Sequence, residues 1–530
     1  MNHAFVPVRR SRFALFILIV SFLAAASCKK DPKAVPEQPG TGNPPPEGSR
    51  SDLTRDSIYL YAKEVYLWND ALPAYEQFNP RQYTSGASEI DDYNMELFAI
   101  TQLKIDPETG RPYEFVSDGS GFPKYSYITD EESNDPSRTE EVNLEGFGTD
   151  FGFTLTGLGT EDAYEIYIRY VNPGSPAAKL GLTRSDVITQ INGRRLGSDF
   201  AADVNFINSA FDQQTLTLSG RKNDGTVFNR SLSKMSYRSS PVLKDTVLTT
   251  GGKVIGYLAF ARFSNPSNAL SALDQAFADF ASAGVNSLVV DLRYNGGGYV
   301  STAEHMVNLI APQRLNGTTM FTEYFNETMR AGKAEILKNQ PLTDENGRQR
   351  FSNGRALTYF DVDYSVEGNT YKFAKKGSLN IEDVVFIVTG NTASASELVI
   401  NSLRPHINVR IIGERSYGKP VGFFPINIEV YDVYYSMFQS RNSAGEGDYF
   451  QGFAPDAETA DDVTHDFGDP AEHSLAAAVR YLTQGSFNAA SSLKVMGRKV
   501  DVRSVEIRNI GMAGGFRGMI ENRVRLKGKF

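Results

Sequence analysis

The chain has 530 residues, of which 41% are hydrophobic and 22% are charged, and its formal net charge is −9. This composition is that of an ordinary globular protein with room for roughly two to four domains, and the acidic balance argues against general nucleic-acid binding. The single cysteine excludes an intrachain disulfide and a cysteine-rich metal cluster, and we expect no cofactor.

A basic start and a short apolar run mark residues 1–27 as a targeting segment. Three arginines precede the apolar stretch Phe13–Ala26, which is short for a membrane span. Ala25-Ala-Ser-Cys28 resembles the point at which a bacterial lipoprotein signal is cut and lipidated, although Ala25 stands where an aliphatic residue is usual. We expect lipidation at Cys28 and a lipid anchor in the cell envelope, at the bacterial outer membrane on its periplasmic or surface side. The alternative is an ordinary signal peptide with a chance cysteine.

A tether and a helical domain are predicted next. Residues 28–52 are rich in Pro, Gly, Lys and Glu, a composition typical of a flexible linker. Apolar residues recur at helical spacing from Leu53 to about Ala71, and a second helix is predicted from Ile90 to Leu103. Residues 53–140 are therefore predicted to form a small helical N-terminal domain, with Trp68 packed in its core.

Residues 141–237 are predicted to form a β-rich unit. Tyr164–Val171 alternates like a strand, and it is followed by Asn172-Pro-Gly-Ser-Pro-Ala-Ala178 and Ser185-Asp-Val-Ile-Thr-Gln-Ile-Asn-Gly193. Together with a preceding glycine loop, these segments resemble a PDZ domain. The resemblance implies that a peptide C-terminus binds by strand addition while loop N–H groups hold its carboxylate. The corresponding loop residues are Asp150, Phe151, Gly152 and Phe153. The alternative is a small β domain that binds nothing.

The third unit, residues 238–485, has an α/β pattern. A strand at Lys253–Phe260 is followed by a helix from about Asn268 to Ala283, ahead of Gly284. Ser287–Arg293 is nearly continuously apolar, as in a buried parallel strand, and a glycine turn at 294–298 precedes a helix to about Ile310. The glycines permit a tight bend, and they also let backbone N–H groups approach a substrate carbonyl.

A serine and a lysine follow the next two strands of this unit. The apolar strand from Val384 ends at Gly390-Asn391, and Ser394 then opens a helix that runs to about Leu403. Free N–H groups at this helix end suit an alkoxide or oxyanion, but Ser394-Ala-Ser-Glu397 also fits a capping box that only starts a helix. Lys419 follows Ser394 by 25 residues, with one helix and one strand between them. This return can bring both side chains to one edge of the sheet.

Thr392-Ala-Ser-Ala-Ser-Glu397, followed by Ile412-Gly-Glu-Arg-Ser-Tyr-Gly-Lys419, resembles the serine–lysine C-terminal processing peptidases, or tail-specific proteases. The resemblance implies a multidomain α/β protein: a crotonase/ClpP-like protease core with an inserted PDZ-like β domain. It assigns the nucleophile to Ser394 and the general base to Lys419. Asp291-Leu-Arg-Tyr-Asn-Gly-Gly-Gly298 resembles the family's D-L-R-x-N-x-G-G element, which implies oxyanion-hole donors at Gly297 and Ala395.

The lysine must be uncharged to accept the serine proton, whereas a free lysine has a pKa near 10.4. We therefore expect an apolar pocket around Lys419, lined by Phe386, Val399 or Phe423. The family's glutamine four residues after the lysine is Phe423 here, so the base is expected to be held differently. The implied reaction is cleavage, through an acyl-enzyme, of peptides or unfolded proteins whose free C-termini bind the PDZ-like domain.

The remaining stretches complete the prediction. Residues 312–379 are expected to form a β insertion or lid, Ile426–Met437 a strand, and Pro470–Leu482 a closing helix. Residues 486–530 form a basic C-terminal extension that packs on the body or touches anionic lipid. A strand is expected within it at Val500, Val502, Val505 and Ile507.

Other functions have weaker support in the sequence. A Ser-His-Asp hydrolase would need a catalytic histidine, but none of the histidines lies in a catalytic motif. His305, just after the glycine turn, is the one histidine that we would test. Two S-x-x-K matches, at Ser231 and Ser491, lie outside the protease unit, and no H-E-x-x-H metal motif occurs. A non-enzymatic alternative is a lipid-anchored peptide-binding scaffold with an inactive protease core.

Overall fold

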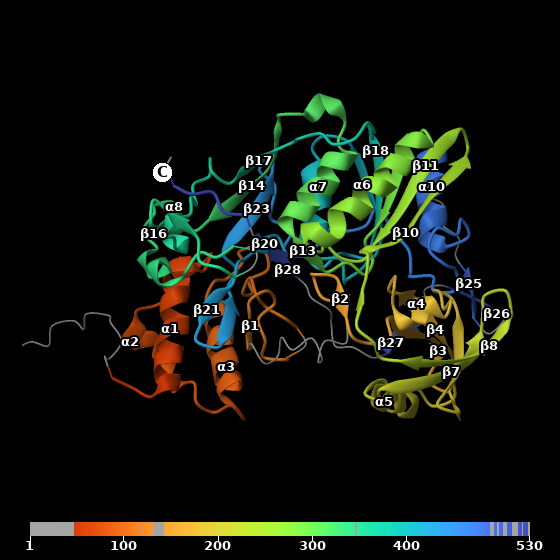
Figure 1. The fold of residues 1–530 in the computed structure, drawn as a ribbon, viewed down its shortest axis with the longest axis horizontal. Helices are drawn as coiled ribbons and strands as arrows, with labels where there is room; N and C mark the ends of the chain where they lie inside the picture. Colours follow the sequence, from red (N-terminus) through yellow and green to blue (C-terminus); the bar gives the residue numbers. More distant parts are fainter. Residues whose placement is uncertain are drawn as a thin grey trace, which may run out of the picture. The chain divides into compact units, whose positions relative to one another are not determined.

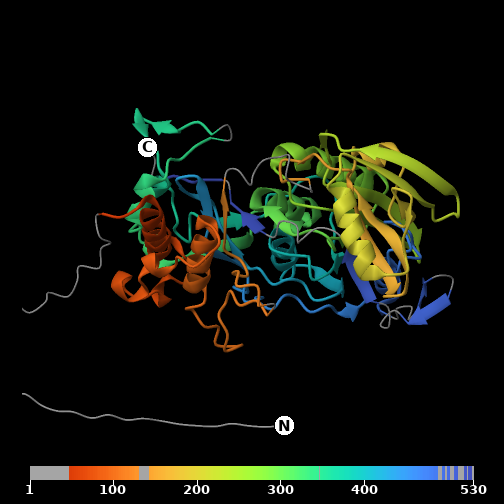
Figure 2. The same ribbon diagram turned by 90° about the horizontal axis from the view of Figure 1, so that it is seen from below.

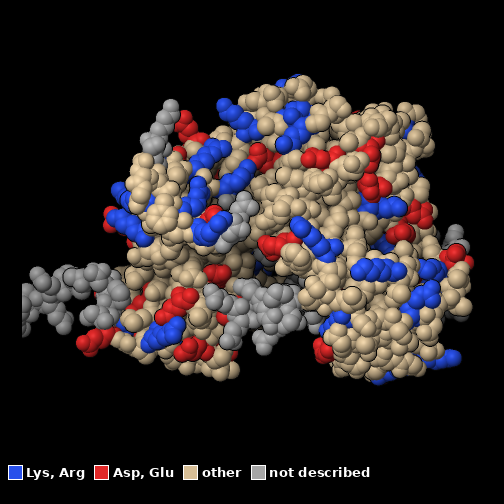
Figure 3. Space-filling view, viewed as in Figure 1, with Lys and Arg blue, Asp and Glu red and all other residues tan. Residues whose placement is uncertain are grey.

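The structure, a computed structural model, describes residues 47–117, 119–130, 142–344, 347–487, 492–495, 498–501, 506–510, 518–521 and 523–527. The predicted signal segment, Cys28 and most of the predicted tether lie outside these residues. No helix within the described ranges is both long and apolar enough to cross a membrane. On the face drawn in Figure 3, acidic and basic side chains are interspersed over the surface.

Helices dominate the N-terminal part, as predicted. The main ones are α1 (Arg50–Val65) and α3 (Glu89–Thr101), with short turns at α2 (Tyr75–Phe78), η1 (Asn69–Ala71) and η2 (Pro80–Gln82). The first helix ends earlier than expected because Tyr66 is extended, with ψ of 133°. Trp68 lies beyond it, buried as predicted and stacked on Tyr113 with ring centroids 4.6 Å apart. This part ends in strand β1 (Tyr127–Asp130).

The β-rich unit is built on one antiparallel sheet of order β27-β3-β4-β5-β7-β8. Its strands are β3 (Phe153–Thr160), β4 (Ala163–Val171), β5 (Val187–Ile191), β7 (Thr215–Arg221) and β8 (Val227–Ser233). Helices α4 (Pro176–Lys179) and α5 (Phe200–Phe211) belong to the same unit, and α5 packs in its core through Ile207 and Ala210. The edge strand β27 (Glu506–Ile510) comes from the far C-terminal part of the chain and pairs antiparallel with β3.

The third unit contains a six-stranded sheet of order β10-β11-β12-β18-β19-β24, which is parallel from β11 onward. The strands are β10 (Val242–Thr250), β11 (Lys253–Phe260), β12 (Ser287–Asp291), β18 (Asp383–Val388), β19 (Asn408–Gly413) and β24 (Ala457–Glu458). Helices α6 (Pro266–Ser282), α7 (Val300–Ile310) and α9 (Ala395–Leu403) cover one face, and α10 (His473–Gln484) covers the other (Figure 1). Successive residues of a strand point to opposite faces of the sheet. Phe386 therefore packs in the core on the side of α6, α7 and α9, and Val385 packs in the core on the side of α10.

The predicted insertion at 312–379 combines short strands with short helical turns, and most of it is irregular. It supplies β14 (Thr319–Phe325) and β17 (Thr370–Lys372) to a sheet completed by β20 (Val421–Gly422) and β23 (Phe438–Asn442). The single strand predicted at Ile426–Met437 is wrong. The chain forms a hairpin there, β21 (Ile426–Ile428) and β22 (Tyr431–Tyr434), because Glu429 turns it with a φ of 61°.

The C-terminal extension is divided between other sheets. Strand β28 (Gly518–Ile520) pairs in parallel with β13 (Gly297–Tyr299) of the glycine turn, while β25 (Ser492–Val495) and β26 (Arg498–Asp501) form a hairpin. Of the residues predicted to form a strand, Val500 lies in β26 and Ile507 in β27, whereas Val502 and Val505 lie outside the described residues. The remaining short elements are β2 (Phe147–Gly148), β6 (Arg194–Arg195), β9 (Tyr237–Arg238), β15 (Phe351–Ser352), β16 (Arg355–Ala356), α8 (Glu327–Arg330), η3 (Gln313–Leu315), η4 (Glu335–Asn339) and η5 (Tyr359–Asp361).

Candidate active site

Ser394 stands at the turn from β18 into α9, as the sequence predicts. Its φ is 62° and its ψ is −112°, a conformation that a non-glycine residue rarely adopts. The side chain is fully buried, and its Oγ has no hydrogen-bond partner among the described residues. Ala395 is the first residue of α9, where backbone N–H groups lack acceptors within the helix. The turn therefore presents a hydroxyl beside a helix N-terminus.

Glu397 joins the serine turn to the lysine loop. Its Oε2 accepts the backbone N–H of Ser394 and that of Lys419, both at 2.8 Å. Its Oε1 accepts the N–H of Gly418 at 2.7 Å and the hydroxyl of Ser416 at 2.6 Å. Burial raises the pKa of Glu397, while these four donors favour its ionised form. The capping interpretation of Glu397 thus omitted its larger role, which is to hold both predicted catalytic residues through one oxygen.

Lys419 is fully buried, in partly aromatic surroundings. Its Nζ donates to the carbonyl of Tyr125 at 3.1 Å and lies 4.5 Å from the centroid of the Phe423 ring. Of the three residues expected to line its pocket, Phe423 therefore contacts the amine, and an aromatic face occupies the position of the family's glutamine. Tyr125, whose hydroxyl also donates to the Gly418 carbonyl at 2.5 Å, was not predicted.

The carbonyl of Tyr125 is held in place by a buried acid of the N-terminal part. Glu114 accepts the backbone N–H of Tyr125 at 3.1 Å and that of Ser126 at 2.8 Å, and it also accepts the hydroxyls of Ser126 and Ser436. A domain to which the sequence assigned no role therefore contributes to the surroundings of the lysine. The sequence signal available was weak: a polar Glu114 in an otherwise irregular stretch.

The glycine turn lies against the serine. A Cβ added to Gly297 would lie 2.9 Å from the Cβ of Ser394, and the φ of Gly297 is 110°, so only glycine fits this contact. The N–H of Gly297 donates to Oδ1 of Asn295 at 2.9 Å. As an oxyanion donor, Gly297 would have to share or exchange that bond, and its role stays a prediction, as does that of Ala395.

A buried charge cluster supports the glycine turn. Arg293 pairs with Asp291 at 2.8 Å, with Asp461 at 2.7 Å and with Glu472 at 2.9 Å. Arg184 of the β-rich unit reaches the same Asp461 at 2.6 Å. Burial opposes ionisation of Asp461, but the guanidinium groups of Arg184, Arg293 and Arg169 prevail and hold its pKa well below the usual value. The cluster thus ties the β-rich unit to the strand end that carries the glycine turn.

The predicted carboxylate loop precedes β3. Gly152 has a φ of 83°, and a Cβ on it would lie 1.9 Å from Cβ of Ser175, so the loop requires glycine here. Phe151 and Phe153 are buried in the unit's own core. Asp150 accepts the Tyr237 hydroxyl at 2.5 Å, and burial raises its pKa to about 6. Recognition of a peptide carboxylate by these four residues stays a prediction.

The residues considered for other chemistries lie elsewhere. Nε2 of His305 bonds Oδ1 of Asp274 at 2.7 Å, and Ser231 is an exposed residue of β8. Ser491 lies outside the described residues. Among the described residues, no three His, Cys, Asp or Glu side chains are grouped so that they could hold a metal ion.

Comparison with known proteins identifies the two main units. The model of peptidase family S41 matches residues 254–459, and a PDZ-domain model matches residues 167–218. Over residues 254–459 the chain is therefore similar to peptidase family S41. The S41 match begins in β11 and ends in β24, and so contains Ser394, Lys419 and the glycine turn.

Curated relatives are about a quarter identical to this chain over the aligned stretches. The chloroplastic C-terminal processing peptidase of Tetradesmus obliquus is 25% identical over 283 residues, covering 50% of this chain and 52% of that protein. The carboxy-terminal-processing protease of Bartonella bacilliformis is 26% identical over 279 residues, covering 50% and 51%. The chain spans about half the length of these relatives. A putative S41 protease structure from Bacteroides fragilis shares the fold, with a TM-score of 0.51, 22% identity and coverage of 81% of this chain and 97% of that one.

Proposed function

We propose that this protein is a serine endopeptidase of the C-terminal processing type, with Ser394 as nucleophile and Lys419 as general base. The observation that carries the proposal is the shared contact of Glu397 Oε2 with the backbone N–H groups of both residues. It supports a fixed spacing between a hydroxyl without a partner among the described residues and a buried amine.

The reaction follows from these positions. Oγ of Ser394 attacks the scissile carbonyl carbon and gives its proton to Nζ of Lys419, which first has to turn from the Tyr125 carbonyl toward Oγ. The tetrahedral oxyanion is stabilised by backbone N–H groups of Ala395 and Gly297. When the C–N bond breaks, the lysine returns the proton to the leaving amine. Water, deprotonated by the same lysine, then hydrolyses the acyl-enzyme.

The substrates proposed are peptides or unfolded proteins that present a free C-terminus to the PDZ unit, and the protein is proposed to be lipid-anchored at Cys28 in the cell envelope. One observation favours the alternative of an inactive, peptide-binding scaffold: the amine bonds the Tyr125 carbonyl and lies against Phe423. The two functions differ in whether Ser394 reacts.

The test is to incubate the protein with a mixture of unfolded proteins and to identify new termini by mass spectrometry, alongside labelling with a fluorophosphonate. We expect Ser394→Ala and Lys419→Ala to abolish cleavage while thermal unfolding stays cooperative. Ser282→Ala, an exposed serine at the end of α6, is the matched control and should cleave normally. Cleavage at the normal rate by either dyad variant would reject the assignment, and a wild-type protein that neither cleaves nor labels is a scaffold.

A further inference from the structure

Strand β28 lies between β13, on the serine side of the site, and Phe423, on the lysine side. On one side Gly518, Met519 and Ile520 pair in parallel with β13. On the other side the N–H of Phe423 donates to the Met519 carbonyl at 3.0 Å, and the N–H of Glu521 donates to the Phe423 carbonyl at 3.2 Å. The segment is therefore bonded as a middle strand, and the dark blue arrow of β28 lies beside β13 and β20 in Figure 1.

This strand runs directly past the proposed catalytic pair. A Cβ added to Gly297 would lie 2.4 Å from the carbonyl oxygen of Gly518 and 2.9 Å from the Cβ of Ser394. The Gly518 oxygen and the Ser394 Cβ are therefore near neighbours. The Phe423 that bonds the other side of the strand is the residue whose ring faces the lysine amine. A carbonyl group of the chain itself thus lies close to the proposed nucleophile.

The same part of the chain also fills the peptide edge of the PDZ unit. Strand β27 pairs antiparallel with β3 over five residues on each side, from Glu506 opposite Gly159 to Ile510 opposite Leu155. β3 starts from the 150–153 loop, and PDZ domains take peptides by adding a strand at a sheet edge. The C-terminal end of β27 is the end nearer that loop. Two peptide-binding edges, one in each unit, are therefore covered by neighbouring stretches of one extension.

We propose that residues 506–510, 518–521 and 523–527, here called the docked segment, are an internal pseudosubstrate that blocks both the PDZ edge and the active-site groove in the resting protein. A protein substrate must displace the docked segment, and its own strand then binds parallel to β13. The substrate part of this inference rests on the function proposed above, whereas the occupancy of the groove does not.

The groove also indicates which substrate side chain it takes. Met519 is fully buried, and Oγ of Ser440 lies 3.5 Å from its Sδ. A Cβ on Gly422 would lie 2.2 Å from the Phe438 ring and 3.0 Å from the Met519 carbonyl oxygen, so the surroundings of Met519 are tightly packed. We expect the residue after the scissile carbonyl to carry an unbranched apolar side chain such as that of methionine, because a flexible side chain fills such a narrow space best.

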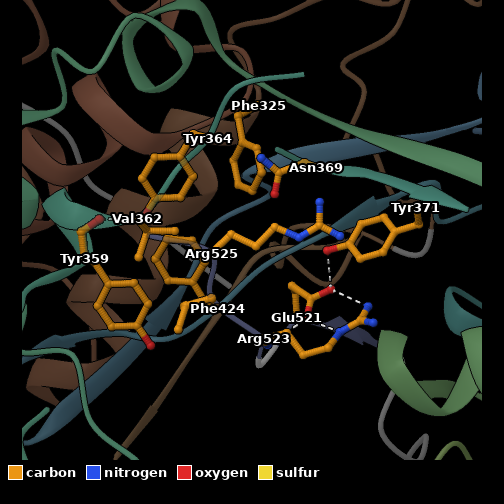
Figure 4. A pocket seen from close by; sticks show the side chains of 11 residues that line it. Phe325, Tyr359, Val362, Tyr364, Asn369, Tyr371, Phe424, Glu521, Arg523 and Arg525 are labelled. Carbon is orange, nitrogen blue, oxygen red and sulfur yellow. Dashed lines mark hydrogen bonds and ion pairs between the residues drawn. The ribbon is translucent and has the colours of Figure 1, made fainter. Parts of the chain in front are cut away.

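The rest of the docked segment is anchored by polar contacts that can be exchanged. The Glu521 carboxylate meets the Tyr371 hydroxyl and the Arg523 guanidinium, each at 3.0 Å (Figure 4). Backbone bonds join Asp363 N–H to the Arg525 carbonyl at 2.7 Å and Lys527 N–H to the Asp361 carbonyl at 2.9 Å. The cavity left beside these residues is only about 70 Å³.

One contact opposes docking. Glu521 is placed next to Glu323, whose Oε1 is buried without a hydrogen-bond partner among the described residues. Burial first, and the neighbouring Glu521 second, raise the pKa of Glu323. Arg523 and the Tyr371 hydroxyl offset part of this effect, but a second buried acid beside Glu323 still carries a desolvation cost. The contact makes the docked state easier to leave.

The test measures groove occupancy without catalysis. On a Ser394→Ala background, binding of a fluorescein-labelled peptide with the sequence of residues 517–527 is followed by anisotropy, with a scrambled peptide as control. Met519→Asp places a charge in the apolar groove, and Arg523→Glu, at a half-exposed site, removes the Glu521 partner. Met519→Leu is the matched control. The tethered segment competes at an effective concentration on the order of 1 mM, so the undisturbed protein should bind the peptide weakly.

We expect both disruptive variants to bind the peptide at least tenfold more tightly than Met519→Leu and the background protein do. With Ser394 restored, they should hydrolyse a fluorogenic peptide at least tenfold faster. Equal binding by all variants, or loss of cooperative unfolding in both disruptive variants, would overturn the inference and make the segment a structural strand. Tighter binding without hydrolysis by any variant would instead overturn the proposed peptidase function.

Discussion

Ser394 is held in a backbone conformation that costs roughly 1 to 3 kcal/mol for a residue with a Cβ. The bonds that keep it there come from its own helix: its N–H is taken by Glu397, and its carbonyl accepts the N–H of Leu398 at 2.8 Å. In this turn the Ser394 side chain makes no capping hydrogen bond, and its hydroxyl has no hydrogen-bond partner among the described residues. At the scale of single residues, the strain is balanced by one buried carboxylate that also fixes the lysine loop.

Glu397→Gln tests that balance. Glutamine keeps the volume but replaces one acceptor oxygen by an NH₂ group, which faces two donors and leaves them unsatisfied. We expect a loss of about 2 kcal/mol or more in the free energy of unfolding and a fall of about 10²-fold in kcat, since small displacements of reacting groups are that costly. Urea unfolding and peptide hydrolysis measure the two effects. Glu458→Gln, an exposed acid on β24, is the control, and an unchanged kcat in Glu397→Gln would remove Glu397 from the site.

Asp150 gives a pH-dependent prediction. Burial raises its pKa to about 6, so the folded protein binds this proton more tightly than the unfolded chain does. The resulting stability is present in full below about pH 4, the ordinary pKa of the group, and is lost as the pH rises through about 6.

Thermal unfolding of the wild type and of Asp150→Asn between pH 4 and pH 7.5 measures this effect. The wild type should lose stability relative to the variant by at most about 3 kcal/mol over this range, and the difference should become constant above about pH 7. Asp162→Asn, an exposed acid in the β3–β4 turn, should show no such trend. A difference that does not depend on pH would show that folding leaves the pKa of Asp150 unshifted.

Elements whose signal is local were predictable from the sequence, and those that depend on distant partners were not. The strand at Lys253–Phe260 has the predicted bounds, and the helix after Ser394 ends at Leu403 as expected. The β21–β22 hairpin was missed because alternation continues through it and its turn, Glu429-Val430, lacks the usual turn residues. Nothing local to Tyr125 or Met519 indicates that they meet Lys419 and Ser440, since those contacts join parts of the chain far apart in sequence.

The strand end that carries the glycine turn depends on Arg293. This side chain is buried and is the shared partner of three acids, so replacing it with methionine leaves Asp291, Asp461 and Glu472 short of a counter-charge. We expect Arg293→Met to lose about 3 to 5 kcal/mol of stability. The matched control is Arg314→Met, which removes an exposed pair with Glu382 and should cost at most about 1 kcal/mol. Chemical denaturation compares the two, and equal losses would mean that the buried cluster contributes no more than a surface pair.

At the scale of the whole molecule, three parts of the chain meet at the glycine turn and the lysine. The S41 core supplies the serine and the lysine, Arg184 of the PDZ unit reaches the cluster beneath the turn, and Tyr125 of the N-terminal part bonds the lysine amine. Figure 2 shows the N-terminal helices and the PDZ unit at opposite ends of the S41 core in this view. Neither flanking part is only an attachment, because each contributes bonds to the site.

The variant Glu114→Gln tests what the N-terminal part contributes to the position of the lysine amine. Glu114 is fully buried and contacts neither Ser394 nor Lys419; it acts by holding the backbone of Tyr125 and Ser126. Glutamine can still accept some of these bonds but presents an NH₂ group to others, so the Tyr125 carbonyl should shift and the lysine amine should lose its fixed position. We expect kcat to fall about tenfold or more while KM changes little, because the substrate groove is not touched.

The measurement is steady-state hydrolysis of a fluorogenic peptide, with the rate of fluorophosphonate labelling at Ser394 as a second readout of the proton acceptor. Glu108→Gln lies in the same part of the chain on the surface and should leave both rates unchanged. If Glu114→Gln lowers the melting temperature but labels Ser394 at the normal rate, the N-terminal part stabilises the protein without positioning the base. A parallel fall in labelling and in kcat, with KM constant, is what a carbonyl that orients Lys419 requires.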